Sequence, residues 1–430
     1  MPRTTTNEAA VLYGEQTRLT LENMSFSGVP LSRFPEYIRQ GALVKKACAL
    51  ANRRAGLLDP GKAGRIMSAC DELATGRYDG QFPVDAYHGG GGIGINMNLN
   101  EVLATLAGGG IDPIDDVNMS QSTSDVCHTA LRLALYERLG ALDGEVADWI
   151  AVVDDLARRF GPIPTVARTC LQDGMKVSCG AVFSGLAGAL LRLHRDCAAA
   201  RQAMTRVNLG WTVIGTGTGA PLAYREAILP ALHEVTGVAV CWHDNLLDAS
   251  QYPDDVAAVS GVVLRLGHVL AKFARDLRLL SSGPETGLHE LSLPAAQAGS
   301  SFFPGKVNPV IPEMMIQCSM LMDAHDGVIQ RCVGLGEIHI NLWEEMMGFL
   351  LLENVDMLVR AMHCLLHRCV AGITVNEAVC RRYATSKIPL VTEAKERYGY
   401  RHLADRIKAE GLDAVVASLK ATVPAPGTRN

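Results

Sequence analysis

The sequence predicts a mainly α fold built around a long helical bundle, and three observations favour it. The clearest is the stretch from Pro253 to Leu280, where apolar residues recur every three or four positions, as on one face of an α-helix. Such a helix of ~27 residues would be ~40 Å long. A similar pattern runs from Leu351 to Cys369. Aromatic residues are only 5% of a chain that is 48% hydrophobic, and a core of small and unbranched side chains suits closely packed helices.

The remaining elements follow from the same reasoning. Helices are also expected at residues 124–139 and 180–204. Pro253 stands at the expected first turn of the periodic helix, followed by acidic residues that suit the positive end of a helix dipole. Polar and glycine-rich residues gather in four expected loops, at residues 87–96, 117–125, 165–174 and 283–309. Long apolar seams need partners, so we expect an antiparallel bundle whose leftover seams associate between subunits.

Composition excludes several classes of partner. The 430 residues carry a net charge of −5 with Lys and Arg spread along the chain, which leaves no basic stripe for nucleic acid and no polybasic patch for a membrane. No N-terminal stretch has the basic-then-apolar order of a signal peptide, and no 18-residue apolar run is free of charge. We therefore expect a cytoplasmic protein with a large core in two or three domains.

Metal-binding and redox motifs are absent from the sequence. The twelve cysteines are widely spaced with no CxxC, so reduced thiols acting as small hydrophobes are expected. His363 and His367 stand about one turn apart in a predicted helix and could share a face, but the sequence has no HExxH. We predict neither a metal nor a cofactor.

One loop concentrates chemistry. The run from Gly299 to Pro309, GSSFFPGKVNP, places two hydroxyls, a cation and an amide between glycines that permit bending and prolines that stiffen the chain. Lys306 and Asn308 are two residues apart, so on an extended loop they share one side. An ammonium and an amide placed together could hold a carboxylate whose negative charge grows during a reaction. This combination indicates carbanion chemistry.

The loop resembles the signature of the fumarase/aspartase superfamily, GSSxxPxKxNP, and the following Val310-Ile311-Pro312-Glu313 is similar to the aspartase branch. Further segments match the superfamily in chain order. They are Tyr13–Arg18 with Glu22-Asn23, Gln81–Asp85, Tyr87–Gly92, Asn96–Val102, Val117–Asp125, Arg168–Asp173 with Phe183–Gly185, and Asn208–Gly217. The resemblance covers nearly the whole chain and implies an N-terminal domain at residues 1–124, a central helical bundle at 125–376 and a small helical domain at 377–430. It also implies a homotetramer whose active sites are each built from three subunits.

The resemblance assigns roles to particular residues. Ser300 would be the general base that removes a proton from carbon next to a carboxylate, acting as an alkoxide stabilised by surrounding donors. Lys306 and Asn308 would stabilise the dianionic intermediate. The residues implied to bind the substrate are Ser122, Thr123, Thr169 and Ser301. Glu313 either orders the loop or helps to stabilise Lys306, or it is a simple acid at a helix N-terminus.

Three departures from the superfamily pattern lie on one side of this chemistry. Ile93, Ser124 and Cys170 stand where the superfamily has a threonine, an asparagine and a histidine or glutamine around the leaving group. Ile93 in particular removes a hydrogen-bonding hydroxyl and adds apolar bulk, which disfavours a small ammonium ion. Cys170 is either a proton donor or a wall of the leaving-group pocket.

The prediction is therefore a carbon–nitrogen lyase that acts on a succinate or aspartate skeleton. It would eliminate a substituted amine, a hydrazine or a nitro group to give fumarate, or run in reverse as addition to fumarate. Two alternatives stay open: an ordinary aspartate ammonia-lyase, and a non-catalytic scaffold or binding protein. Retention of Ser300 beside Lys306 and Asn308 argues against the scaffold, which has no physical need for an exposed base beside a cation.

Overall fold

The computed structural model describes residues 10–421 and is mainly α-helical, as the sequence predicts. The chain divides into two compact units, each made of separate stretches of sequence. Unit 1 holds the described residues up to Asp143, Arg195–Arg265 and Met320–Val359, and unit 2 holds Gly144–His194, Leu266–Ser319 and the described residues from Arg360 on. The three domains expected from the sequence stay a prediction.

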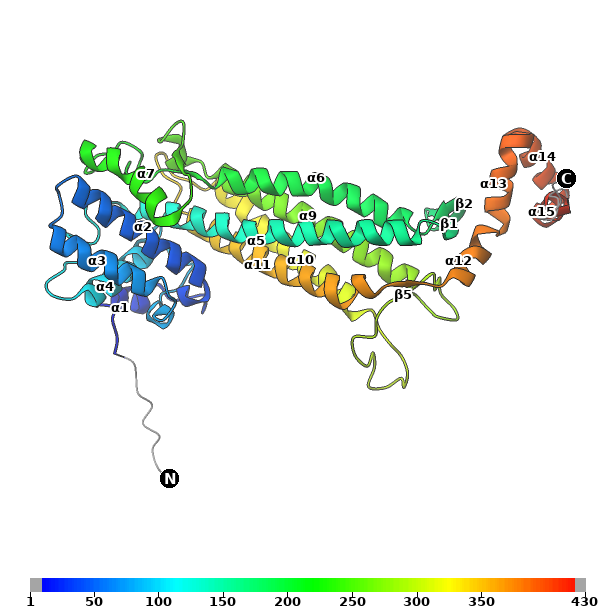
Figure 1. Ribbon diagram of the computed structural model, residues 1–430, viewed down its shortest axis with the longest axis horizontal. Coiled ribbons are helices and arrows are strands. Elements are labelled where there is room, and N and C mark those ends of the chain that lie inside the picture. Colours follow the sequence, from blue (N-terminus) through cyan, green and yellow to red (C-terminus); the bar gives the residue numbers. More distant parts are fainter. Residues whose placement is uncertain (1–9, 422–430) are drawn as a thin grey trace, which may run out of the picture. The chain divides into compact units, whose positions relative to one another are not determined.

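Five long helices dominate the chain (Figure 1). They are α5 (Thr123–Phe160), α6 (Ala181–Ala203), α9 (Asp254–Leu280), α10 (Val310–Val333) and α11 (Glu344–Arg368), and the boundaries of the two units fall inside all five. The helices expected at 180–204 and 253–280 agree with α6 and α9. The helix expected at 124–139 is longer than predicted, because the glycine that follows does not end it. Gly140 instead leaves room for the guanidinium of Arg201, which would lie 3.0 Å from an added Cβ and donates a hydrogen bond to the Tyr136 carbonyl.

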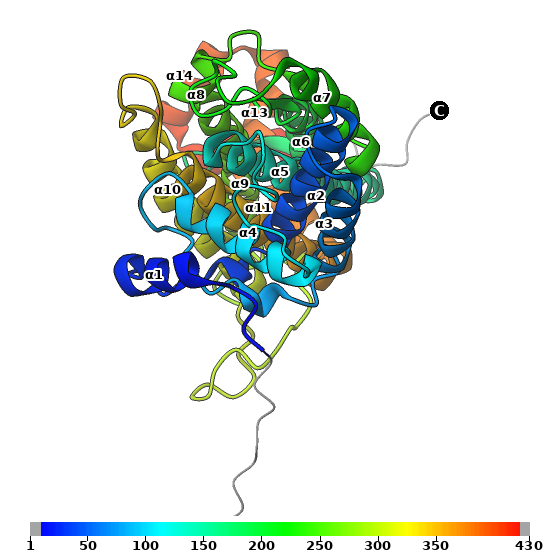
Figure 2. The same cartoon turned by 90° about the vertical axis from the view of Figure 1, so that its left-hand side faces the viewer.

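Unit 1 also contains the N-terminal helices. These are α1 (Glu15–Met24), α2 (Pro35–Arg54), α3 (Pro60–Leu73), α4 (Ile93–Ala107) and α7 (Leu222–Thr236). Both α2 and α3 begin with proline, which suits the first helical turn, and the Asp59 side chain caps α3 by accepting a hydrogen bond from the backbone N–H of Lys62. Figure 2 shows α2 lying beside α3 and α7, against which it packs.

A buried charged cluster ties α5 to α9 and α11 inside unit 1. The Arg132 guanidinium contacts Asp255 at 2.6 Å and Glu344 at 3.2 Å, and the His128 imidazole lies 3.0 Å from Glu344 and 3.5 Å from Glu345. Burial alone would lower the pKa of His128, but the negative charges of the two glutamates outweigh it and raise the pKa to about 10. His128 is therefore an imidazolium ion at neutral pH.

We expect this cluster to make stability depend on pH above neutrality. The folded state holds the His128 proton up to about pH 10, whereas an unperturbed imidazole releases it near its ordinary pKa of 6.5. The contribution is therefore complete below pH 6.5 and is lost as pH rises toward 10. Thermal unfolding followed by circular dichroism should show a melting temperature that falls across this window. A His128→Gln variant should melt lower at pH 6.5 and depend less on pH; equal slopes for the two proteins would contradict the assignment.

Unit 2 has an aromatic core. The Trp149 and Phe183 rings each pack edge-on against Phe273, and Phe160 packs edge-on against Phe183. The indole N–H of Trp149 donates to the backbone carbonyl of Met362, so this core joins α5, α6 and α9 and also holds α11. Edge-to-face pairs add about 0.5–1.5 kcal/mol beyond the area they bury.

A β-hairpin in unit 2 replaces the loop expected at residues 165–174. Strand β1 (Pro164–Thr169) pairs antiparallel with β2 (Gln172–Ser178), and the turn between them consists of Cys170 and Leu171, both with positive φ. Two-residue turns of this kind match the twist of a hairpin but normally use glycine or asparagine, so the sequence carried no hairpin signal. The loop prediction for this segment was therefore wrong.

The C-terminal helices of unit 2 begin beside this hairpin in space. They are α12 (Glu377–Ala384), α13 (Lys387–Tyr398), α14 (Tyr400–Glu410) and α15 (Leu412–Ala421). Helices α12 and α13 contact β1 and β2, and a small core of Leu403, Val415 and Leu419 joins the last three helices. The remaining elements are short: α8 (Asp248–Gln251), β3 (Arg206–Val207) paired with β4 (Cys241–Trp242), β5 (Leu291–Ser292) paired with β6 (Thr374–Val375), and 3-10 turns at Leu31–Arg33, Asp79–Gln81 and Val370–Gly372.

Helix α9 is long and apolar enough to cross a membrane by length and composition alone. However, 56% of its most apolar window is buried inside the protein, as is usual for a core helix.

Candidate active site

The predicted catalytic loop of unit 2 closes on itself. The Gly299 N–H donates to the Lys306 carbonyl at 2.9 Å, and the Asn308 side-chain amide donates to the Gly299 carbonyl at 2.6 Å. A third bond runs from the Lys306 N–H to the Phe303 carbonyl at 3.2 Å. These bonds bring the segment that carries Ser300 against the segment that carries Lys306 and Asn308.

Ser300 occupies a position that favours negative charge on its oxygen. Its Oγ accepts hydrogen bonds from the backbone N–H groups of Phe302 at 3.0 Å and Phe303 at 2.9 Å. Donors aimed at an oxygen stabilise its deprotonated form. The loop thus provides two of the donors that an alkoxide at Ser300 requires.

Gly299 is required by close packing. A Cβ at this position would lie 2.5 Å from both the backbone nitrogen of Asn308 and the carbonyl oxygen of Lys306. We expect Gly299→Ala to displace the loop by about 1 Å and to lower kcat/KM by about 10²-fold, with little change in melting temperature because the loop is exposed. Gly64→Ala, in α3 with nothing within 4 Å, is the matched control and should leave activity unchanged. Steady-state kinetics of the two variants would make the comparison, and full activity in Gly299→Ala would count against the loop geometry.

Lys306 and Asn308 line one cavity of 540 Å³ in unit 2. Arg278, His289 and Glu313 also line it, and Glu313 forms an ion pair with Arg278 at 3.4 Å. The two fixed cations therefore exceed the single carboxylate, which suits a small anionic ligand. Sequence reasoning missed Arg278 and His289, because Arg278 fits the ordinary polar face of α9 and His289 lies in a segment without a motif.

Glu313 lies in the first turn of α10. Its backbone N–H donates to the Pro309 carbonyl, and its side chain pairs with Arg278. Of the two roles left open by the sequence, the position agrees with a helix N-terminal acid.

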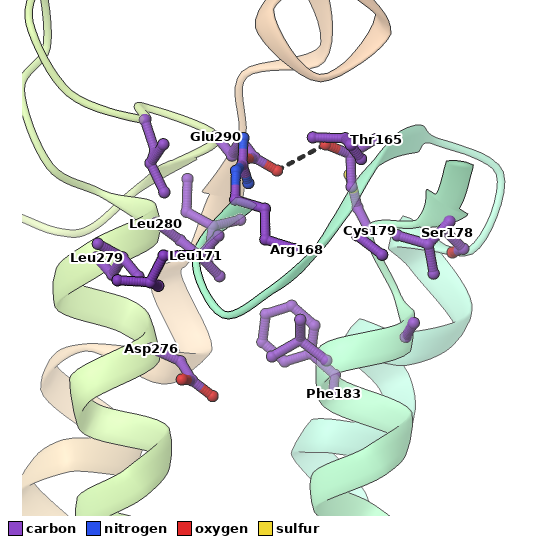
Figure 3. Close-up of a pocket in the computed structure, with 17 residues that line it drawn as sticks. Thr165, Arg168, Leu171, Ser178, Cys179, Phe183, Asp276, Leu279, Leu280 and Glu290 are labelled. Atoms are coloured by element: carbon purple, nitrogen blue, oxygen red, sulfur yellow. Dashed lines mark hydrogen bonds and ion pairs between the residues drawn. The ribbon is translucent and has the colours of Figure 1, made fainter. Parts of the chain in front are cut away.

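Thr169 and Cys170 lie at the tip of the β1–β2 hairpin, where both are exposed. Glu290 holds strand β1 in place. It is buried, accepts a hydrogen bond from Thr165 at 2.6 Å and forms an ion pair with Arg168. Figure 3 shows these three residues at one end of a second cavity, of 390 Å³. The adjoining wall includes Leu171, Phe183, Leu279 and Leu280. Because Glu290 neutralises Arg168 and most of the wall is apolar, this cavity suits a diacid less well than the Lys306 cavity.

Ser122, Thr123 and Ser124 lie together in unit 1 at the N-terminus of α5. Asp125 holds this turn in place by accepting backbone N–H bonds from Ser122 at 2.9 Å, Gly210 at 3.1 Å and Thr212 at 3.2 Å. Burial raises the pKa of Asp125 to about 6, against these hydrogen bonds, which lower it. The N–H groups of the first helical turn are suited to a carboxylate ligand.

Lys45 supports the same turn through the residues that precede Ser122. Sequence reasoning missed this lysine. It is fully buried in α2, and its Nζ donates to the side-chain oxygens of Asn118 at 2.8 Å and Gln121 at 2.9 Å. Burial lowers its pKa to about 8. No motif marks Lys45, because a single lysine on a helix normally belongs to the solvated face.

The three residues predicted for the leaving-group pocket fall in both units. Ile93 is the first residue of α4 and is 43% exposed, and Asn96 in the next turn donates to the Thr123 hydroxyl at 3.1 Å. Ser124 is buried, and its hydroxyl makes no hydrogen bond within the described residues. Cys170 belongs to unit 2. The predicted site residues thus lie at the start of α4 and α5 in unit 1, and on the Ser300–Asn308 loop and the tip of the β1–β2 hairpin in unit 2.

Comparison with known proteins identifies the family. Residues 4–321 match a family described as lyase. The chain belongs to this lyase family. It is 39% identical over 403 residues to an aspartate ammonia-lyase of Helicobacter pylori, covering 91% of this chain and 86% of the relative. An aspartate ammonia-lyase of Escherichia coli is 36% identical over 398 residues, covering 89% and 83%.

Solved structures of lyase-family relatives confirm the predicted fold class. A fumarate lyase:delta crystallin from Brucella melitensis, solved bound to cobalt, superposes with a TM-score of 0.89 at 36% identity, covering 96% of both chains. A class II fumarase from Schistosoma mansoni superposes with a TM-score of 0.89 at 25% identity, covering 95% of this chain and 92% of that one. The predictions of an enzyme of the lyase class and of a fumarase/aspartase-like fold are therefore confirmed.

Proposed function

We propose that this lyase breaks a carbon–nitrogen bond in a four-carbon, aspartate-like diacid and releases fumarate. The observation that carries the proposal is the closed loop from Gly299 to Asn308, which combines a hydroxyl that accepts two N–H bonds with a cation that lines a cavity of 540 Å³. In this reaction Ser300 takes a proton from one substrate carbon. The electron pair left behind forms the double bond, and the nitrogen group leaves the neighbouring carbon with its bonding electrons.

Lys306 and Asn308 act where negative charge develops. Proton removal beside a carboxylate produces a dianion, which fixed donors in a cavity stabilise better than water does. Asn308 donates one amide N–H to the Gly299 carbonyl, so its second N–H is available for the substrate. Arg278 lines the same cavity, where its charge is offset by the ion pair with Glu313. Ser122, Thr123, Thr169 and Ser301 are proposed to bind the substrate.

The leaving group is proposed to be a substituted amine, a hydrazine or nitrite rather than free ammonia. The support is the side chain of Ile93, whose partly exposed apolar surface cannot hydrogen-bond an ammonium ion. By the superfamily resemblance, Ser124 and Cys170 would alter the same part of the site. Nitrite leaves as a stable anion without an acid, whereas an amine needs a proton, which Cys170 could donate.

Ordinary aspartate ammonia-lyase activity is the second candidate. It is favoured by 36–39% identity, over most of the chain, to relatives named for that activity. The same cavity and loop would serve it, so only the group released distinguishes the two.

We further propose a homotetramer in which loops of several copies complete each active site. The support is the superfamily resemblance of the motif segments, which are scattered along the chain, with Ser122–Ser124 in unit 1 and Ser300–Asn308 in unit 2. Sedimentation equilibrium would test the tetramer. Restored activity on mixing Ser122→Ala and Ser300→Ala proteins would test the sharing.

A substrate panel tests the leaving group. We expect ultraviolet absorbance of fumarate to rise with N-substituted aspartates, hydrazinosuccinate or nitrosuccinate. It should rise at least about 10²-fold more slowly with L-aspartate and L-malate, because a site lacking the required hydrogen bonds disfavours ammonia and water as leaving groups. Efficient turnover of L-aspartate would establish the second candidate instead. An Ile93→Thr variant is the matched probe, and it should gain activity toward L-aspartate.

A further inference from the structure

Two histidines and a glutamate converge on the surface of unit 2. His363 and His367 lie on α11, and Glu145 lies on α5. One ligand atom from each of the three residues lies within 4.8 Å of the other two. The His363 Nδ1 is 3.5 Å from a Glu145 carboxylate oxygen, and the two imidazole rings have centroids 4.3 Å apart.

The spacing of the two histidines suits chelation. Residues four apart lie on one face of a helix, one above the other, which is the arrangement that lets two histidines bind a single zinc ion. Both side chains are exposed, so small rotations of the rings can bring their nitrogens to the separations required by metal–nitrogen bonds of about 2.0–2.1 Å.

The backbone beneath the three residues is rigid. Trp149, one turn after Glu145 on α5, is fully buried and donates its indole N–H to the carbonyl of Met362, the residue before His363. This bond fixes α5 against α11 beside the three ligands. A site on two helices held in this way is better organised than one on loops.

The electrostatics favour an added cation. One carboxylate oxygen of Glu145 is buried and accepts no hydrogen bond from the described residues. A transition metal binds the neutral form of imidazole, which carries the lone pair that the metal needs. A metal ion at Glu145 Oε2, the oxygen near His363, would bind both imidazoles and would offset the charge of the whole carboxylate.

We propose that Glu145, His363 and His367 bind a divalent transition-metal ion of the zinc type. Two imidazoles and one carboxylate form a recognised three-ligand zinc set, with water at the remaining position. The imidazoles select against magnesium and calcium, which prefer oxygen ligands. The ion would clamp α5 to α11 and stabilise unit 2.

The sequence predicts no metal site, so this proposal departs from that prediction. The two histidines alone fit a solvated helix face, and no HExxH supplies a carboxylate nearby in sequence. Glu145 is far from His363 in the chain and is brought there only by the packing of α5 against α11.

The test is zinc binding by the full-length protein, stripped with a chelator, desalted and kept reduced. Isothermal titration with Zn²⁺ should give one ion per chain, with micromolar or tighter affinity. Replacing an outer-shell partner of a metal typically weakens affinity 10–100-fold, so loss of a ligand in His367→Ala should weaken it by about 100-fold or more. Glu145→Gln, which keeps the shape of the side chain, should weaken binding too.

Controls separate this site from adventitious binding. His402→Ala removes another exposed histidine of unit 2 and should bind zinc like the wild type. Zinc should raise the melting temperature of the wild type and of His402→Ala, but not that of His363→Ala/His367→Ala. No zinc uptake by the wild type at tens of micromolar would overturn the proposal. Unchanged affinity in the double variant would also overturn it and would assign the zinc to other groups, such as the exposed thiols.

Discussion

Ser300→Ala is expected to lower kcat by about 10²–10⁴-fold, the usual contribution of a positioned general base. The hydroxyl is the only group that the substitution removes, and the two N–H groups that point at it remain in place. Substrate binding rests on other residues, so the affinity for fumarate should change little. Steady-state kinetics and fumarate titration of the same preparation would measure both quantities.

Ser301→Ala is the matched control, because it removes the same atom from the next residue of the loop. A substrate-binding role for Ser301 predicts a higher KM with kcat within about tenfold of the wild type. If Ser300→Ala kept wild-type kcat, or if the two variants behaved alike, Ser300 would not be the base.

Lys306→Met should lower kcat/KM by about 10²–10³-fold, the loss found when one group that stabilises a developing oxyanion is removed. Methionine keeps most of the length and the contact with Phe303, over whose ring the Lys306 ammonium lies at 5.4 Å, but removes the charge. The fall should appear in kcat as well as in KM, because the dianion carries more charge than the ground state. Steady-state kinetics with the preferred substrate of the panel provides the measurement.

Lys408→Met provides the control for net charge, since Lys408 is an exposed lysine on α14. It should retain full activity. An equal loss of activity in both variants would indicate a general electrostatic effect and would remove Lys306 from the reaction.

The long helices could be predicted because their apolar residues recur with the helical period over many turns. The expected span of α9 differs from the observed one by a single residue, from Pro253 to Asp254 at its start. The end of α5 could not be predicted. A glycine usually weakens a helix, and only the structure shows that Gly140 makes room for the side chain of Arg201. The hairpin was missed for a related reason: Cys170 and Leu171 adopt positive φ without the residues that usually signal it.

The candidate site shows the same contrast. The residues of the Ser300 loop could be predicted because their chemistry lies in one short run of sequence. Arg278 and Lys45 could not, because their importance comes from a cavity and from burial, neither of which has a local pattern. Glu145 is a third case, since only tertiary packing brings it to His363 and His367.

The most direct test of the proposed chemistry is the reverse reaction in D₂O, followed by proton NMR. Fumarate and the amine released from the best substrate should yield an N-substituted aspartate. It should carry one deuteron at the carbon from which Ser300 removes the proton in the forward reaction, next to the carbon that bears nitrogen. Ser300→Ala should form this product at least about 10²-fold more slowly. Formation of the same deuterated product at equal rates by both proteins, or no product from the wild type with any substrate or amine of the panel, would contradict the account.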